Sequence, residues 1–191
     1  MNPPLTREEI NADDRRFLLE LARATITDSL CDRPVASPAP DSGVLLETRG
    51  AFVTLKIDSV LRGCIGHVIG VAPLWQAVRD NALGAAFDDP RFPPLTSDEL
   101  QQVGIEISAL TPMQRSSAEE VVVGRHGILI QNGAARGLLL PQVATEYGWD
   151  RETFLDHTCR KAGLEPGCWR RPDTIISTFS AEVFSENRTQ F

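Results

Sequence analysis

Cysteine and histidine are scarce in this chain. Its 191 residues contain four cysteines and three histidines. The cysteines form no C-x-x-C pair, and with the scattered histidines they do not match the spacing of a zinc site; they are Cys31, Cys64, Cys159 and Cys168. We therefore expect no metal and no bound cofactor. A chain of this length can bury a sufficient core without metal or disulfide staples.

Long apolar runs and excess positive charge are also missing. No apolar run approaches the roughly 20 residues that cross a bilayer, and no charged-then-apolar leader precedes the first predicted helix. We expect a cytoplasmic protein that has no membrane partner and reduced cysteines. Because 26 Asp and Glu outnumber 19 Lys and Arg, the formal charge is −7. Nucleic acid is therefore not an expected partner.

The N-terminal third predicts one helix followed by a loop. Residues 6–9 and residues 11–14 each have the spacing of a capping box, so either could begin the helix. Apolar residues then recur at helical intervals from Phe17 to Leu30. Three prolines in residues 32–43 predict a loop, which is a candidate crossover between two lobes.

Strand and helix signals are interleaved along the rest of the chain. Alternating apolar residues predict strands, and apolar residues at helical spacing predict helices; the strands are expected over 44–57, 105–109 and 175–184, and the helices over 74–86, from 96, over 141–147 and over 150–163. The Asn132-Gly133 pair predicts a β-hairpin over 127–140, because it tolerates the positive φ angles of the turn. Since regular βα alternation is missing, we expect an α+β fold with mainly antiparallel sheet and flanking helices.

The richest chemistry lies in residues 61–67, LRGCIGH, where two glycines enclose a cysteine between an arginine and a histidine. In an extended strand Arg62 and Cys64 would share one face, and His67 would point to the other. Arg62 would then favour the thiolate of Cys64. His67 is a weaker catalytic candidate, because it reaches the thiol only if the strand bends at Gly66.

Two interpretations of Cys64 stay open. In the first it is a nucleophile, redox residue or ligand-contacting thiol, with ligand-accessible backbone at Gly63 and Gly66. In the second it is a small buried hydrophobic residue, and the glycines serve only close packing.

Two further segments carry candidate ligand-binding residues. Asp89 and Arg91 lie in the short loop DDPRF, where Arg91 could bind a carboxylate or phosphate, or could form a local ion pair that fixes the loop. Gln142 follows a proline at a predicted helix start, where free amides could meet an anion. Trp75, Trp149 and Trp169 are more typical of a core or a lobe interface than of a base-stacking platform.

Three blocks together resemble the AMMECR-type domain family: residues 61–66 (LRGCIG), 85–95 (AAFDDPRFPPL) and 137–144 (GLLLPQVA). Similarity continues through residues 148–150, 153–155 and 159–164, so it covers nearly the whole chain. Arg62, Gly63, Cys64 and Gly66 match the family motif. His67 departs from it, because Thr or Ser is frequent there.

The resemblance implies one domain over residues 1–191, with a larger and a smaller lobe around a cleft and Cys64 at its functional surface. It implies no established reaction. A short, acidic, bacterial-type version implies companions that resemble a radical-SAM enzyme and a Memo-type protein. Two hypotheses follow: an enzyme or enzyme subunit acting on a small substrate in the cleft, or a noncatalytic partner-binding or scaffold module.

Overall fold

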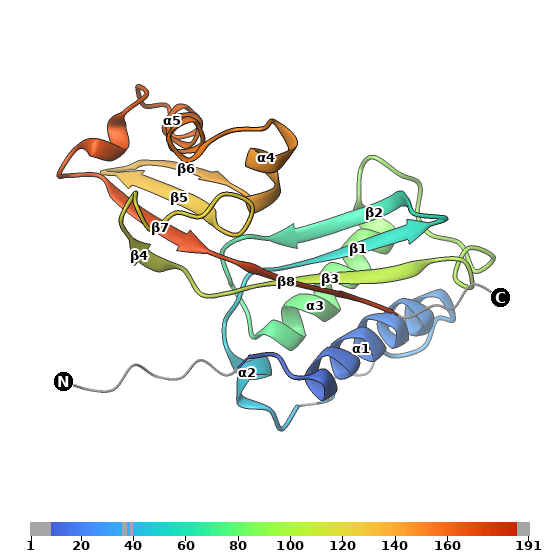
Figure 1. Cartoon of the computed structure of the whole chain (residues 1–191). Coiled ribbons are helices and arrows are strands. Elements are labelled where there is room, and N and C mark those ends of the chain that lie inside the picture. Colours follow the sequence, from blue (N-terminus) through green and yellow to red (C-terminus); the bar gives the residue numbers. More distant parts are fainter. Residues whose placement is uncertain (1–8, 36–37, 39, 187–191) are drawn as a thin grey trace. The chain divides into compact units, whose positions relative to one another are not determined.

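The computed structural model describes residues 9–35, 38 and 40–186. The chain divides into two compact units, unit 1 with Met1–Leu110 and Glu182–Phe191, and unit 2 with Thr111–Ala181. The loop over 32–43 belongs to unit 1, so the chain passes between units after Leu110 and after Ala181 instead. Each unit combines helices with a four-stranded sheet (Figure 1), and the α+β prediction is confirmed.

Unit 1 is a sheet with helices on one face (Figure 1). Its strand order is β2-β1-β3-β8, and β1 pairs antiparallel with both β2 and β3. The elements are α1 (Ala12–Leu30), α2 (Gly43–Leu46), β1 (Ala51–Ile57), β2 (Val60–His67), α3 (Leu74–Leu83), the π-helical turn η1 (Gly84–Asp88), β3 (Gly104–Leu110) and β8 (Ala181–Ser185).

A local signal explains where α1 begins. Asn11 caps α1: its side-chain oxygen accepts from the backbone N–H groups of Asp13 and Asp14. The other candidate start includes residues 6–8, which lie outside the described residues. The predicted strand from Val44 is wrong at its beginning, because Gly43–Leu46 forms one helical turn that buries Val44 and Leu45.

The core of unit 1 lies between the sheet and the helices α1 and α3. Alternate residues of β1 and β3 point into it, including Val53 and Ile107, which are fully buried with Leu18, Ile26 and Val78 from the helices. The opposite parity of β1 therefore places Phe52, Thr54 and Lys56 on the face that these helices do not cover.

Unit 2 contains a second sheet, of order β4-β7-β5-β6, against which α5 packs. Gly133 has φ +57°, as the predicted hairpin turn between β5 and β6 requires, and Asp150 caps α5 as expected. The elements are β4 (Gln114–Ser116), β5 (Gly127–Asn132), β6 (Ala135–Leu139), α4 (Pro141–Glu146), α5 (Arg151–Lys161), the short η2 (Cys168–Arg170) and β7 (Ile175–Phe179).

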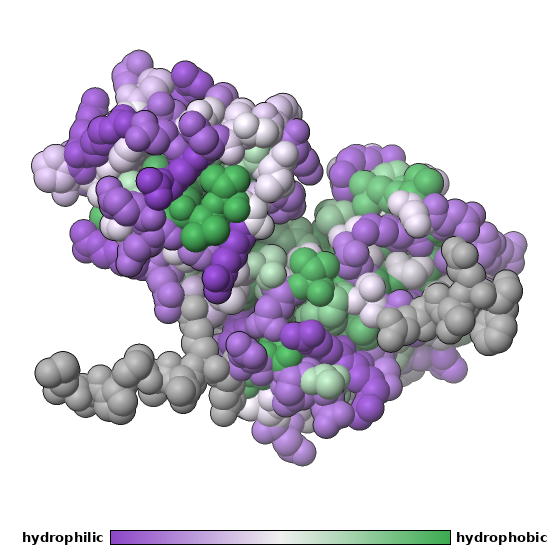
Figure 2. Space-filling view, viewed as in Figure 1, coloured by the Kyte–Doolittle hydropathy of each residue, from purple (hydrophilic) through white to green (hydrophobic). Residues whose placement is uncertain are grey.

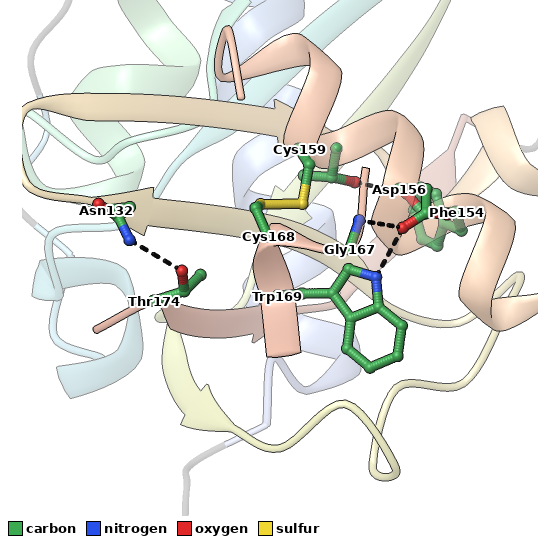
Figure 3. The surroundings of a disulfide bond; sticks show 9 residues. Asn132, Phe154, Asp156, Cys159, Gly167, Cys168, Trp169 and Thr174 are labelled. Carbon is green, nitrogen blue, oxygen red and sulfur yellow. Dashed lines mark hydrogen bonds between the residues drawn. A yellow bond between two sulfur atoms is a disulfide. The ribbon is translucent and has the colours of Figure 1, made fainter. Parts of the chain in front are cut away.

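A buried disulfide joins Cys159 at the end of α5 to Cys168 in η2 (Figure 3). The expectation that all four cysteines are reduced is therefore wrong. Beside the disulfide, the Asp156 carboxylate accepts hydrogen bonds from the Gly167 backbone N–H and the Trp169 indole N–H, at 2.7 and 2.8 Å. Residue spacing did not reveal the pair, because only the reversal of the chain after α5 brings the two sulfurs together.

The surface shown in Figure 2 is mostly hydrophilic, with separate hydrophobic patches on each unit. Within the described part of the chain, no helix is both long and apolar enough to span a membrane.

Candidate functional site

Cys64 lies on the edge strand β2, directly opposite Thr54 of β1. Its neighbours on either side face the helices, because Gly63 abuts the backbone of η1 and Ile65 contacts Gly84. Cys64 consequently points to the other face of the sheet, where its side chain is half-buried. There the Thr54 hydroxyl donates a hydrogen bond to the Cys64 sulfur at 3.3 Å.

Arg62 does not lie beside the thiol as the strand parity predicted. The register shifts between Leu55 and Lys56, so that Arg62 is an extra residue on β2. Its guanidinium binds Glu99 with two hydrogen bonds, from Nε at 2.7 Å and from Nη2 at 3.0 Å. These bonds lower the pKa of Glu99 to about 2 and raise that of Arg62, so the ion pair is intact at neutral pH.

Asp89 and Arg91 close the free edge of β2 at the cysteine. The backbone N–H of Cys64 donates to Asp89 Oδ2 at 2.8 Å, and Arg91 Nη2 donates to the Cys64 carbonyl at 3.2 Å. Arg91 also donates to the Asp89 carboxylate from Nε and Nη2, at 2.9 and 2.7 Å. The pair thus satisfies two backbone groups that an edge strand otherwise leaves to solvent, and it holds Cys64 in place.

The Asp89 carboxylate is charged although its side chain is only 2% exposed. Hydrogen bonds from the Arg91 side chain hold its pKa well below the usual range; burial opposes this effect, and the N–H groups of Cys64 and Arg91 add to it. Asp89 is therefore a poor proton acceptor near neutral pH. Of the two roles considered for Arg91, the local ion pair is present, and its side chain remains 54% exposed.

Neighbouring atoms occupy the space where a side chain would lie at both motif glycines. A Cβ at Gly63 would lie 2.1 Å from the backbone oxygen of Ala85, and one at Gly66 would lie 2.4 Å from the Phe52 ring. Gly63 thus lets η1 approach β2 closely enough for the following Asp89 to reach Cys64. These contacts favour the close-packing interpretation of the two glycines, and ligand binding at Gly63 and Gly66 stays a prediction.

Sequence reasoning missed several polar residues around Cys64. Thr54 is opposed by Cys64 on one side and by Glu106 of β3 on the other, so the three residues form a row across the sheet. Lys56, two residues along β1, binds both carboxylate oxygens of Glu106 at 3.0 Å. The alternation of polar and apolar residues in β1 was the signal that could have placed Thr54 and Lys56 on the same face as Cys64. Glu99, the partner of Arg62, lies in the segment from 96 that was expected to begin a helix, and that segment forms turns instead.

Two sequence-predicted candidates, His67 and Gln142, remain. His67 is exposed at the end of β2, opposite Ala51, and Gln142 is exposed in α4 of unit 2. Within the described residues of unit 1, no hydrogen bond joins His67 to Cys64. Their roles in catalysis and ligand binding remain predictions. The described residues also contain no group of three or more His, Cys, Asp and Glu that could hold a metal ion.

Comparison with known proteins places this geometry in a family. The AMMECR1 family model matches residues 19–184. Protein TK0174 of Thermococcus kodakarensis is 44% identical over 182 residues, which cover 89% of each chain, and protein MK0488 of Methanopyrus kandleri is 42% identical over 193 residues, which cover 96% of this chain and 93% of the relative. These relatives are archaeal and give no support to a bacterial source.

A solved structure is similar as well. The crystal structure of uncharacterized protein PH0010 from Pyrococcus horikoshii is 42% identical and matches with a TM-score of 0.69 over 90% of each chain. Because the family model and the relatives each match most of the sequence, the chain belongs to the AMMECR1 family.

Proposed function

We propose that this protein is an enzyme or enzyme subunit that uses Cys64 to react with a small anionic or activated substrate. One observation carries the proposal: the Cys64 thiol is free and only half-buried, and it lies on the sheet face that α1 and α3 leave uncovered. The reaction and the substrate are not named by this geometry. In keeping with the family resemblance, the protein would act together with radical-SAM and Memo-type companion proteins.

The surroundings of Cys64 support a division of roles. The Thr54 hydroxyl donates to the sulfur and so holds the Cys64 side chain against β1. Asp89 is a positioning residue, because it holds the Cys64 backbone and the Arg91 guanidinium. Among the described contacts of Arg91, Nε and Nη2 are engaged and Nη1 is not, so Nη1 is available for an anionic substrate group.

A noncatalytic partner-binding or scaffold module is the second candidate. It is favoured because several motif residues make structural contacts. Arg62 binds Glu99, and neighbouring atoms occupy the space beside the Cα atoms of both glycines. In that case residues 61–67 form a folding element, and the surface around Cys64 docks a companion.

The reactivity of Cys64 separates the two functions. In a Cys31→Ser variant kept without reductant, Cys64 is the remaining free thiol. We expect iodoacetamide to modify it in the native protein at least as fast as in urea-unfolded protein, as measured by intact mass near neutral pH. A native rate about tenfold or more below the unfolded rate would support the noncatalytic module.

Substrate capture then addresses the enzyme hypothesis directly. Wild-type protein and Cys64→Ala protein are incubated with metabolite extract, and covalent mass shifts are compared after denaturation. An adduct that maps to Cys64 in the wild type and is lost in the variant identifies a reacting substrate. Equal adduct patterns in the two proteins would count against a reacting cysteine.

A further inference from the structure

Unit 2 carries a stack of three aromatic rings at its surface. Tyr147 stacks on Trp149 with ring centroids 5.0 Å apart, and Trp149 stacks on His157 with centroids 3.8 Å apart. Gly148 has φ +65°, which lets the chain reverse after α4 and lay Trp149 against α5. At the other end of the stack, His157 Nε2 lies 3.3 Å from Arg160 Nη1, within hydrogen-bond distance.

Tyr147 is the most exposed of the three stacked residues. Tyr147 is 67% exposed and is the one exposed Phe, Tyr or Trp side chain among the described residues. Four other rings in the described structure have a guanidinium of the same chain over them, 3.7 to 5.7 Å from the ring centroid; they are Phe184, Trp75, Phe92 and Trp169. No such cation lies over Tyr147 within that part of the chain.

The charges beside Tyr147 favour a cation. The Glu146 carboxylate, next to it in sequence, is exposed and makes no hydrogen bond or ion pair within the described structure. Asp150 is also exposed and caps α5 by accepting from the Thr153 N–H. The nearby Arg151 is engaged elsewhere, since its Nη1 donates to the Glu119 carbonyl.

We propose that the outer face of Tyr147 is a docking point for an arginine or lysine side chain of a partner protein. The cation would lie over the ring, with Glu146 beside it. Two features favour this interaction: the stacked rings are already ordered, so little rotamer entropy is lost on binding, and the exposed Glu146 carboxylate adjoins Tyr147 in the sequence. Tyr, Trp and Arg are also enriched at interface hot spots. The proposal does not depend on the reactivity of Cys64.

A pair of peptides tests the charge requirement. The isotope-labelled full-length protein is titrated with acetyl-Gly-Arg-Gly-Arg-Gly-amide, and the indole N–H signal of Trp149 is followed by NMR. We expect a saturable shift with the arginine peptide and a much weaker one when both arginines are replaced by citrulline, which has nearly the same shape without charge. Equal binding of the two peptides would overturn the proposal.

Variants test the position. Tyr147→Leu should weaken arginine-peptide binding about fivefold, the size of an exposed cation–π contact, whereas Tyr147→Phe should stay within about twofold because the ring is kept. Glu146→Gln should weaken binding about two- to threefold. Val60→Ala, at a 69% exposed apolar side chain of unit 1, is the control and should leave the affinity unchanged.

Two results would contradict the proposal. One is unchanged peptide affinity in folded Tyr147→Leu protein. The other is saturable shifting of the Trp149 signal by an oligothymidylate in place of the arginine peptide, which would identify the stack as a platform for nucleic-acid bases.

Discussion

Reduction of the Cys159–Cys168 disulfide should destabilise unit 2 by a calculable amount. The two cysteines are nine residues apart, so the bond closes a loop of about ten residues in the unfolded chain. The chain-entropy relation assigns such a loop a stabilisation of about 2.7 kcal/mol at 25 °C. In the folded protein the two hydrogen bonds to Asp156 hold the same segment without the bond. We therefore expect the reduced protein to keep its fold and to lose stability.

Urea unfolding measures the difference. Trp149 and Trp169 lie in unit 2, so tryptophan fluorescence reports on its unfolding, with Trp75 reporting on unit 1. With a urea m-value of about 1.5 kcal/mol per molar, a loss of about 2.7 kcal/mol lowers the midpoint of unit 2 by roughly 2 M. Reduction changes no side-chain volume apart from the broken bond, which makes it a cleaner perturbation than substitution.

The control is Cys159→Ala/Cys168→Ala protein, whose midpoint should not respond to reductant. Thiol titration in denaturant without reductant should find two free thiols, in keeping with free Cys31 and Cys64. Four free thiols, or equal midpoints for oxidised and reduced protein, would refute the reasoning.

Three further predictions concern unit 1. As pH falls from 4.5 toward about 2, the Arg62–Glu99 pair should lose its contribution, because the pKa of Glu99 is lower in the folded state; Arg62→Gln should flatten this part of the curve of urea midpoint against pH, and an unchanged slope would contradict it. Gly63→Ala should cost about 1–3 kcal/mol or more of unfolding free energy, since the new methyl meets backbone, while Gly104→Ala, whose nearest contact is 3.8 Å, should be near neutral by the same measurement. In the Cys31→Ser background, Thr54→Val should slow alkylation of the motif thiol and Thr54→Ser should restore it; equal rates would remove the hydroxyl from the site.

Much of the secondary structure could be predicted because its signals are local. The cap at Asn11, the Asn132-Gly133 turn and the cap at Asp150 each depend on a few consecutive residues whose backbone geometry restricts the choice. The motif over 61–67 was considered as an extended strand, and it lies in β2, but the register shift at Arg62 breaks the expected parity. Periodicity failed for Gly43–Leu46, where one short helical turn buries apolar residues as well as a strand would.

The amino-acid sequence by itself determined the α+β class, most helix and strand positions, the hairpin and the family, because these follow from periodicity, turn chemistry and contiguous motifs. Only the tertiary structure decided what the motif residues contact. A one-residue bulge sent Arg62 to Glu99, 37 residues away, and close packing of η1 brought Asp89 to the Cys64 backbone. These partners are brought together by the packing of elements that are far apart in the sequence. Residue spacing along the chain therefore does not predict which of them come into contact.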